Sequence, residues 1–287
     1  MSRWKKACCA LVLCLLVVLC GLIGEYFAVE NGALQQTLEG KTVAEAETRP
    51  LETQTCTQED PGAAVLAAAM GNLNQALLQQ TALPETYQIQ DFPIVLQMPQ
   101  LPTGCEITAL TMALQYYDYP VDKTVMASQY LPTAPADFYY GSDGRRYGPD
   151  MEHNFVGNPT TNLGYICGTS AIVTAANGYL EEQGSALRAV DRTGASAEEL
   201  YELVSQDKPV VVWVTIGMAD RRATQGWYTQ TGEYMEWSTN DHGAVLIGYT
   251  QDTVTIADPI SGMVEYSRTQ FEEVFSSRGS RCVILEE

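Results

Sequence analysis

In the C-terminal two thirds of the chain, the apolar residues follow two different patterns, one before and one after residue 208. In three stretches they recur every three or four residues, which is the spacing of an amphipathic helix. We expect these helices to begin at Cys105, after Cys167 and after Ser196, where Glu199 completes a capping box. Beyond residue 208 the apolar residues gather in short runs between turn residues, which is typical of strands. These runs are residues 209–216, 242–249, 254–257, 263–266 and 282–285.

Three further patterns complete the predicted elements. Residues 227–237 alternate polar and aromatic residues around Thr231-Gly232 and predict a hairpin, and residues 269–275 predict a short helix. Residues 130–162 are rich in Tyr, Gly, Pro and Asp without periodicity and predict a long surface loop. Helices followed by an antiparallel sheet indicate an α+β domain.

The N-terminal third has a different pattern. Basic residues at positions 3, 5 and 6 precede an apolar run over residues 7–23, as in a signal peptide or an N-in signal anchor. Residues 30–62 are rich in Gln, Thr, Glu and Ala, which cannot bury enough surface to fold, and a helical pattern follows to about residue 80. We therefore expect a signal anchor or signal peptide at 1–29, a stalk with one helix at 30–85 and a folded domain at 86–287, outside the cytoplasm and tethered or secreted.

Composition and charge exclude some partners. The formal net charge of -19 argues against nucleic acid, because binding phosphates needs basic patches. Four of the eight cysteines lie in the N-terminal apolar run, and the others, Cys56, Cys105, Cys167 and Cys282, form no C-x-x-C pair that would indicate zinc. A single disulfide among Cys56, Cys167 and Cys282 stays open. The spacing of Asp143, Asp150 and Glu152 does not match a calcium loop, so we expect no metal or cofactor.

Cys105 is the first candidate for chemistry. It follows a Pro-Thr-Gly turn and opens the first predicted helix. Unpaired backbone N–H groups and the positive end of the helix dipole favour a thiolate there, which is the reactive form of a nucleophilic cysteine. A buried structural cysteine is the alternative.

A cysteine nucleophile needs a base, and the chain holds two histidines. His242 starts a strand beside Gly243, and Asp258 ends the next strand before Pro259. Adjacent antiparallel strands joined by a tight turn would bring these two side chains close together. The alternatives are a core histidine and an Asp-Pro turn. His153 lies in a polar loop, where we expect a solvated or substrate-rim position, and Cys167 is expected in the core.

Three motifs together resemble a known family. Residues 97–106 (QMPQLPTGCE) followed by Thr108-Ala109-Leu110, residues 241–245 (DHGAV) and residues 257–259 (ADP) resemble papain-like cysteine peptidases. More narrowly, they are similar to the family 39 type, which is related to peptidases that remove double-glycine leaders from bacteriocins. The resemblance covers about residues 86–287 and implies a papain-like α+β fold. It also implies that an upstream glutamine donates to the oxyanion together with the Cys105 backbone N–H. Gln97 stands in the family position, and Gln100 is the competitor.

The resulting hypothesis is an extracytoplasmic thiol peptidase that acts on a peptide or protein. Cys105 would attack the carbonyl, His242 would move the proton, Asp258 would orient His242, and Gln97 would stabilise the oxyanion. Transpeptidase or amidase action would use the same residues, so the sequence does not separate these reactions from hydrolysis. It does not specify the oligomeric state either. The alternative is a catalytically silent papain-like domain that binds peptide or cell-wall material.

Overall fold

The computed structural model describes residues 83–287. The predicted signal segment at 1–29 and nearly all of the predicted stalk at 30–85 lie outside the described residues, as does Cys56. Within residues 83–287, no helix is both long and apolar enough to cross a membrane.

A seven-stranded sheet forms the centre of the fold. Six strands lie in the order β12-β11-β10-β7-β13-β6, and β1 pairs separately with β10. All these pairings are antiparallel. Every residue of β7 is buried, as expected for a central strand that is apolar on both faces. The strands are β1 (Tyr87–Gln88), β6 (Arg188–Asp191), β7 (Val210–Thr215), β10 (Asp241–Tyr249), β11 (Thr253–Asp258), β12 (Gly262–Ser267) and β13 (Cys282–Glu286).

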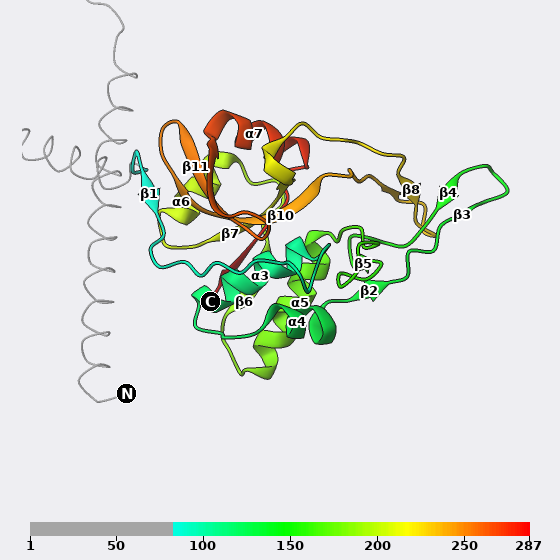
Figure 1. Ribbon diagram of the computed structural model, residues 1–287, viewed down its shortest axis with the longest axis horizontal. Coiled ribbons are helices and arrows are strands. Elements are labelled where there is room, and N and C mark those ends of the chain that lie inside the picture. Colours follow the sequence, from blue (N-terminus) through cyan, green and yellow to red (C-terminus); the bar gives the residue numbers. More distant parts are fainter. Residues whose placement is uncertain (1–82) are drawn as a thin grey trace, which may run out of the picture. The chain divides into compact units, whose positions relative to one another are not determined.

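Helices cover both sides of this sheet (Figure 1). The α-helices are α3 (Cys105–Tyr116), α4 (Lys123–Val125), α5 (Thr169–Glu182), α6 (Ala197–Val204) and α7 (Arg268–Ser277), and two short turns are η1 (Met126–Tyr130) and η2 (Ile216–Met218). α3 and α5 lie on one side and α7 on the other (Figure 1). The Tyr201 hydroxyl of α6 donates to Glu272 of α7 at 3.0 Å, which places α6 beside α7. The predicted α+β architecture is confirmed.

The predicted start of α6 is also confirmed. The Ser196 side chain accepts the Glu199 N–H at 3.2 Å, and the Glu199 carboxylate accepts the Ser196 N–H at 2.7 Å. This reciprocal capping box satisfies two backbone donors that the first helical turn leaves unpaired.

The segment at 130–162 differs from the predicted loop, because it contributes four strands of two residues each. β2 (Thr133–Ala134) pairs in parallel with β5 (Phe155–Val156). β3 (Tyr139–Tyr140) and β4 (Arg146–Tyr147) join β8 (Trp227–Tyr228) and β9 (Tyr234–Met235), the two strands of the predicted hairpin, in a four-stranded sheet. Figure 1 shows this small sheet reaching away from the seven-stranded one. Two-residue strands are too short to show an alternation of period two in the sequence.

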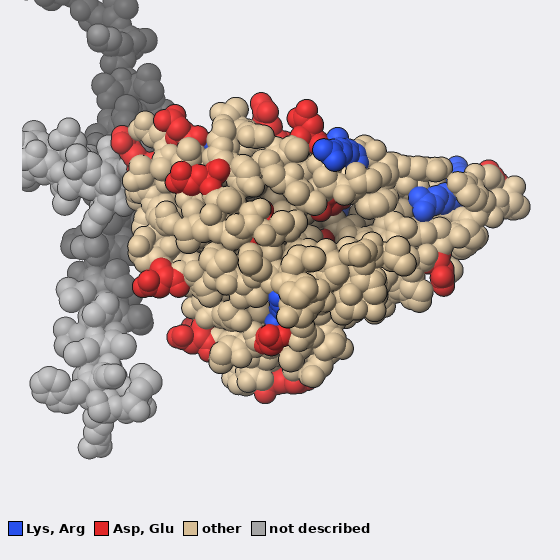
Figure 2. Space-filling view, viewed as in Figure 1, with Lys and Arg blue, Asp and Glu red and all other residues tan. Residues whose placement is uncertain are grey.

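Acidic residues dominate the surface. Figure 2 shows Asp and Glu at many separate points of one face, whereas Lys and Arg on that face are few and stand apart. This distribution agrees with the formal net charge of -19. The face in view offers no continuous basic surface to a nucleic-acid backbone.

Candidate active site

A tight turn delivers Cys105 to the start of α3. The Gly104 N–H donates to the Leu101 carbonyl at 3.0 Å, and the Gly104 carbonyl accepts the Thr108 hydroxyl at 2.7 Å. A Cβ on Gly104 would lie 2.9 Å from the Leu101 Cβ, so the turn leaves no room for a side chain. Cys105 is therefore held at a helix start that is nearly closed to solvent, with the residue 7% exposed.

His242 and Asp258 meet at one end of the neighbouring strands β10 and β11. His242 Nε2 lies 3.1 Å from Asp258 Oδ1, and both side chains are buried. The same Asp258 oxygen accepts the N–H groups of Ile260 at 2.6 Å and Ser261 at 3.0 Å. Burial raises the pKa of Asp258, but hydrogen bonding and charge attraction from His242, with these two N–H groups, hold that pKa below its ordinary value. An ionised Asp258 therefore lies within ion-pair distance of Nε2, although among residues 83–287 neither ring nitrogen of His242 has a partner in good hydrogen-bond geometry.

Gly243 lets the first turn of α3 pack directly on the backbone of β10. A Cβ at Gly243 would lie 2.7 Å from the Glu106 Cα and 3.0 Å from the Glu106 nitrogen. The Gly243 N–H also lies near enough to the Cys105 sulfur to lower the pKa of the thiol by hydrogen bonding. The structure thus places the Cys105 sulfur beside the backbone that carries His242.

We expect Gly243→Ala to destabilise the protein by about 1–3 kcal/mol, because the new methyl group meets buried backbone and not a flexible side chain. Chemical denaturation with urea measures this loss. Gly178→Ala in α5 is the matched control, since its Cβ would meet only Tyr130 at an ordinary 3.7 Å and alanine favours a helix. Equal stability of the two variants would show that α3 has room to move away from β10.

Gln97 connects the strand end at Asp258 with the turn before Cys105. Its backbone N–H donates to the Pro259 carbonyl at 2.7 Å, and its side-chain amide donates to the Pro102 carbonyl at 2.9 Å. The Lys123 ammonium donates to the Gln97 carbonyl at 3.1 Å and anchors the same segment. Gln97 is 3% exposed, whereas Gln100 is exposed. Gln97 is therefore buried and hydrogen-bonded to the turn before Cys105, whereas Gln100 lies at the surface.

Comparison with known proteins identifies the family. A family model described as "Peptidase_C39 like family" matches residues 89–283. The chain belongs to this family. The predicted resemblance to family 39-type peptidase domains is confirmed.

Two relatives of this C39-like protein cover most of the matched range. The uncharacterized protein YvpB of Bacillus subtilis (strain 168) is 29% identical over 189 residues, which are 66% of this chain and 71% of YvpB. The crystal structure of a candidate C39-like peptidase from Bacillus anthracis is 32% identical, covers 71% of this chain and 98% of its own, and superposes with a TM-score of 0.62. A double glycine motif protease from an AMS/PCAT transporter, solved with its leader peptide, is 18% identical over 69% of this chain and 93% of its own, with a TM-score of 0.36.

The electrostatics at the Cys105 thiol of this C39-like protein differ from the sequence-based expectation. Burial and the neighbouring Glu106 raise the pKa of the thiol well above its ordinary value, although N–H groups at Gly243 and Glu106 act in the opposite direction. The thiol donates a hydrogen bond to Glu106 Oε2 at 3.3 Å. A helix start alone predicts a lowered pKa, but that prediction ignored the burial of the site and the acid next to the cysteine. Glu106, 1% exposed, is the site residue that sequence reasoning missed. The sequence did contain a signal for a buried acid. Glu106 directly follows the cysteine, and the residues after it are almost all apolar or small.

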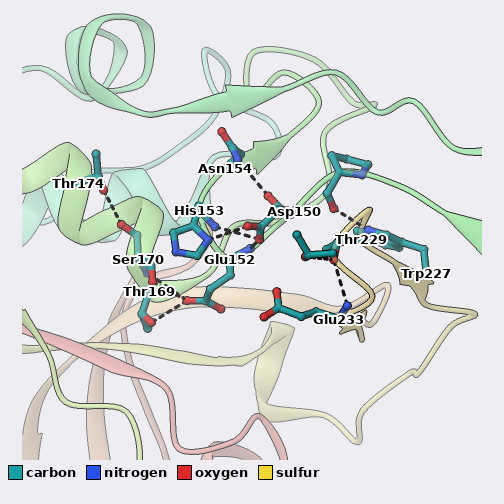
Figure 3. Close-up of polar contacts among 12 residues, drawn as sticks. Asp150, Glu152, His153, Asn154, Thr169, Ser170, Thr174, Trp227, Thr229 and Glu233 are labelled. Carbon is teal, nitrogen blue, oxygen red and sulfur yellow. Dashed lines mark hydrogen bonds and ion pairs between the residues drawn. The ribbon is translucent and has the colours of Figure 1, made fainter.

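Asp150, Glu152 and His153, which the sequence also singled out, lie in a separate cluster (Figure 3), whereas Asp143 accepts a hydrogen bond from Tyr147. His153 is solvent-exposed, and its Nδ1 lies 2.7 Å from Asp150 Oδ2. Glu152 accepts hydrogen bonds from the side chains of Thr169 and Ser170 and so anchors the start of α5 (Figure 3). Across the described part of the chain, no group of three or more His, Cys, Asp or Glu side chains could hold a metal ion.

The remaining cysteines of the domain are buried and unpaired. Cys105, Cys167 and Cys282 are all thiols, so no disulfide joins them in the described residues. The Cys167 carbonyl accepts the Trp213 indole N–H at 2.8 Å, which ties the segment before α5 to the central strand β7. Cys167 has a core position, as the sequence predicted.

Proposed function

We propose that this C39-like protein is a cysteine peptidase that hydrolyses peptide bonds through Cys105, His242, Asp258 and Gln97. One observation carries the proposal: His242, buried and paired with Asp258 of β11, lies on β10 next to Gly243, which packs against the first turn of α3, where Cys105 begins the helix. A nucleophile, a base and a group that orients the base are the three parts that a thiol peptidase needs.

In the proposed reaction, the Cys105 thiol gives its proton to His242 Nδ1 while the sulfur attacks the peptide carbonyl carbon. Asp258 holds Nε2 and stabilises the imidazolium that forms. The Gln97 amide and the Cys105 backbone N–H donate to the oxyanion. The imidazolium then protonates the leaving amine, and a water molecule that gives a proton to His242 hydrolyses the thioester.

A cavity beside the nucleophile turn is the proposed entry for the substrate. It has a volume of about 640 Å³, and segments 133–136 and 157–161 form most of its lining. The Thr103 hydroxyl donates to the Thr161 carbonyl at 3.0 Å, so the cavity wall is joined to the turn that carries Cys105. A space of this size accommodates a short extended segment of a peptide.

The proposed place of action is outside the cytoplasm, with the domain tethered by residues 1–29 or secreted. This part of the proposal rests on the basic residues before the apolar run at 7–23.

A catalytically silent domain that binds peptides is the second candidate. It is favoured by the hydrogen bond that holds Cys105 as a thiol against Glu106 and by the small exposure of Cys105. A silent domain needs no reactive sulfur, so the reactivity of Cys105 separates the two candidates.

Alkylation of the full chain with iodoacetamide at about pH 6.5, followed by mass spectrometry of the Cys105 peptide, tests the proposal. We expect Cys105 to react up to about 100-fold faster than the cysteine of a free reference peptide, because an ordinary thiol with a pKa near 8.5 is only about 1% ionised there. His242→Ala should remove this advantage, since the imidazolium partner of the thiolate is lost. If Cys105 reacts no faster than the reference peptide, and His242→Ala changes nothing, the silent domain replaces the peptidase.

A further inference from the structure

Glu106 is a buried acid whose carboxyl group contacts the nucleophile. It is the second residue of α3 and is 1% exposed. Its Oε2 accepts the Cys105 S–H at 3.3 Å, Oε1 has no hydrogen-bond partner among the described residues, and the nearby backbone N–H of Cys167 acts to lower the pKa of the carboxyl group. A Cβ on Gly243 would lie 2.9 Å from the Glu106 Cγ, so β10 confines the side chain at this place.

No cation pairs with Glu106 among the described residues, although charged groups surround it. On β10, Asp241 faces Glu106 but is itself paired with Arg278, whose Nε lies 2.7 Å from Asp241 Oδ1. Arg281, near Cys167, is paired with Glu152. Other nearby groups are the Cys105 and Cys167 thiols, while His242, next to Gly243 on β10, points to the opposite face of the strand. Burial, followed by the charge of Asp241, raises the pKa of Glu106 to about 7, although the N–H groups and the Cys105 thiol act to lower it.

We infer that Glu106 is a proton-sensitive brake on the nucleophile: its carboxylate holds Cys105 as a thiol, and its protonated form releases the sulfur to His242. The inference rests on the proposed peptidase function and adds a residue that regulates it. The carboxylate accepts the S–H and, as a negative charge, opposes formation of a second negative charge on the sulfur. The carboxylic acid has no such charge, and its O–H can donate to a thiolate. In the released state the Cys105 proton moves to His242 Nδ1, while the proton of Glu106 stays on its carboxyl group.

The pH dependence that follows has a distinctive sign. As the pH rises through the Glu106 titration near 7, the carboxylate forms and the Cys105 thiolate becomes less favourable. The reactivity of Cys105 should therefore fall in this interval, whereas the reactivity of an ordinary thiol rises with pH. The proposed enzyme is thus expected to work best in mildly acidic surroundings.

The test is the iodoacetamide rate of Cys105 in the full chain between about pH 5 and pH 9, in wild type and Glu106→Gln. We expect the wild-type rate to pass through a maximum below pH 7 and to fall several-fold before ordinary thiol ionisation raises it again. Glu106→Gln keeps the shape of the side chain and removes its charge, so its rate should not fall and should exceed the wild-type rate about tenfold near pH 8. Glu202→Gln, which changes an exposed acid of α6, is the control and should reproduce the wild-type profile.

Three outcomes decide whether the brake exists. Coinciding profiles for wild type and Glu106→Gln overturn the brake and leave the peptidase proposal standing. If Glu106→Gln does not fold, the wild-type profile decides alone, because a rate that only rises with pH contradicts the brake. If wild-type Cys105 reacts no faster than the cysteine of a free reference peptide at any pH, the proposed function itself fails, and the brake fails with it.

Discussion

Replacing His242 with alanine is expected to lower kcat/KM for a cleaved peptide by about three to four orders of magnitude. The variant loses the acceptor for the Cys105 proton in the first step and the donor to the leaving amine in the next. It also leaves the Asp258 carboxylate buried without its partner at 3.1 Å. The measurement is the initial rate of hydrolysis of a peptide identified with the wild-type protein, at substrate concentrations well below KM.

The other histidine of the chain provides the control. His153 is exposed and pairs with Asp150 in the loop before α5, so His153→Ala should leave kcat/KM unchanged. Because His242→Ala also leaves a buried carboxylate unpaired, it should lose about 1–3 kcal/mol of stability, and the folded fraction must be measured in parallel by circular dichroism. A folded His242→Ala variant that keeps most of its activity would remove His242 from the proposed mechanism.

That His242 and Asp258 lie close together could be predicted, because their strands are consecutive and antiparallel. A tight turn between two such strands leaves few registers, so residues at the outer ends come together. The observed register, with Val245 opposite Ala257, places the two side chains in contact. The sequence also places Gly243 beside His242, but the close packing of α3 on this glycine became visible only in the structure.

Other features depend on packing between distant segments and had no clear pattern in the sequence. The burial of Glu106 results from the contact of α3 with β10, more than 130 residues further along the chain. The same burial raises the pKa of Cys105, against the expectation for a helix start. In the segment at 130–162, β4 pairs with β8, which lies about 80 residues further along the chain. The local sequence pattern does not predict a pairing over such a distance.

Replacing Gln97 with alanine is expected to lower kcat about 100- to 1,000-fold with little change in KM, as for the loss of one oxyanion donor elsewhere. The negative charge on the oxygen develops only when sulfur attacks, so the amide stabilises the transition state more than the bound substrate. Gln97 is suited to this role because its backbone is fixed by the Pro259 carbonyl and by Lys123, and its side chain is buried beside the turn to Cys105.

Gln100→Ala is the matched control, since it removes the same amide from an exposed position three residues away. We expect its kcat to equal that of wild type, and steady-state kinetics of the two variants on one peptide provide the comparison. The difference between the variants depends on burial: a donor that water already surrounds contributes little to the oxyanion, whereas one fixed in a dry site needs no reorganisation during the reaction. A larger loss in Gln100→Ala than in Gln97→Ala would reverse the assignment. Equal and small losses would leave the Cys105 backbone N–H as the donor that matters.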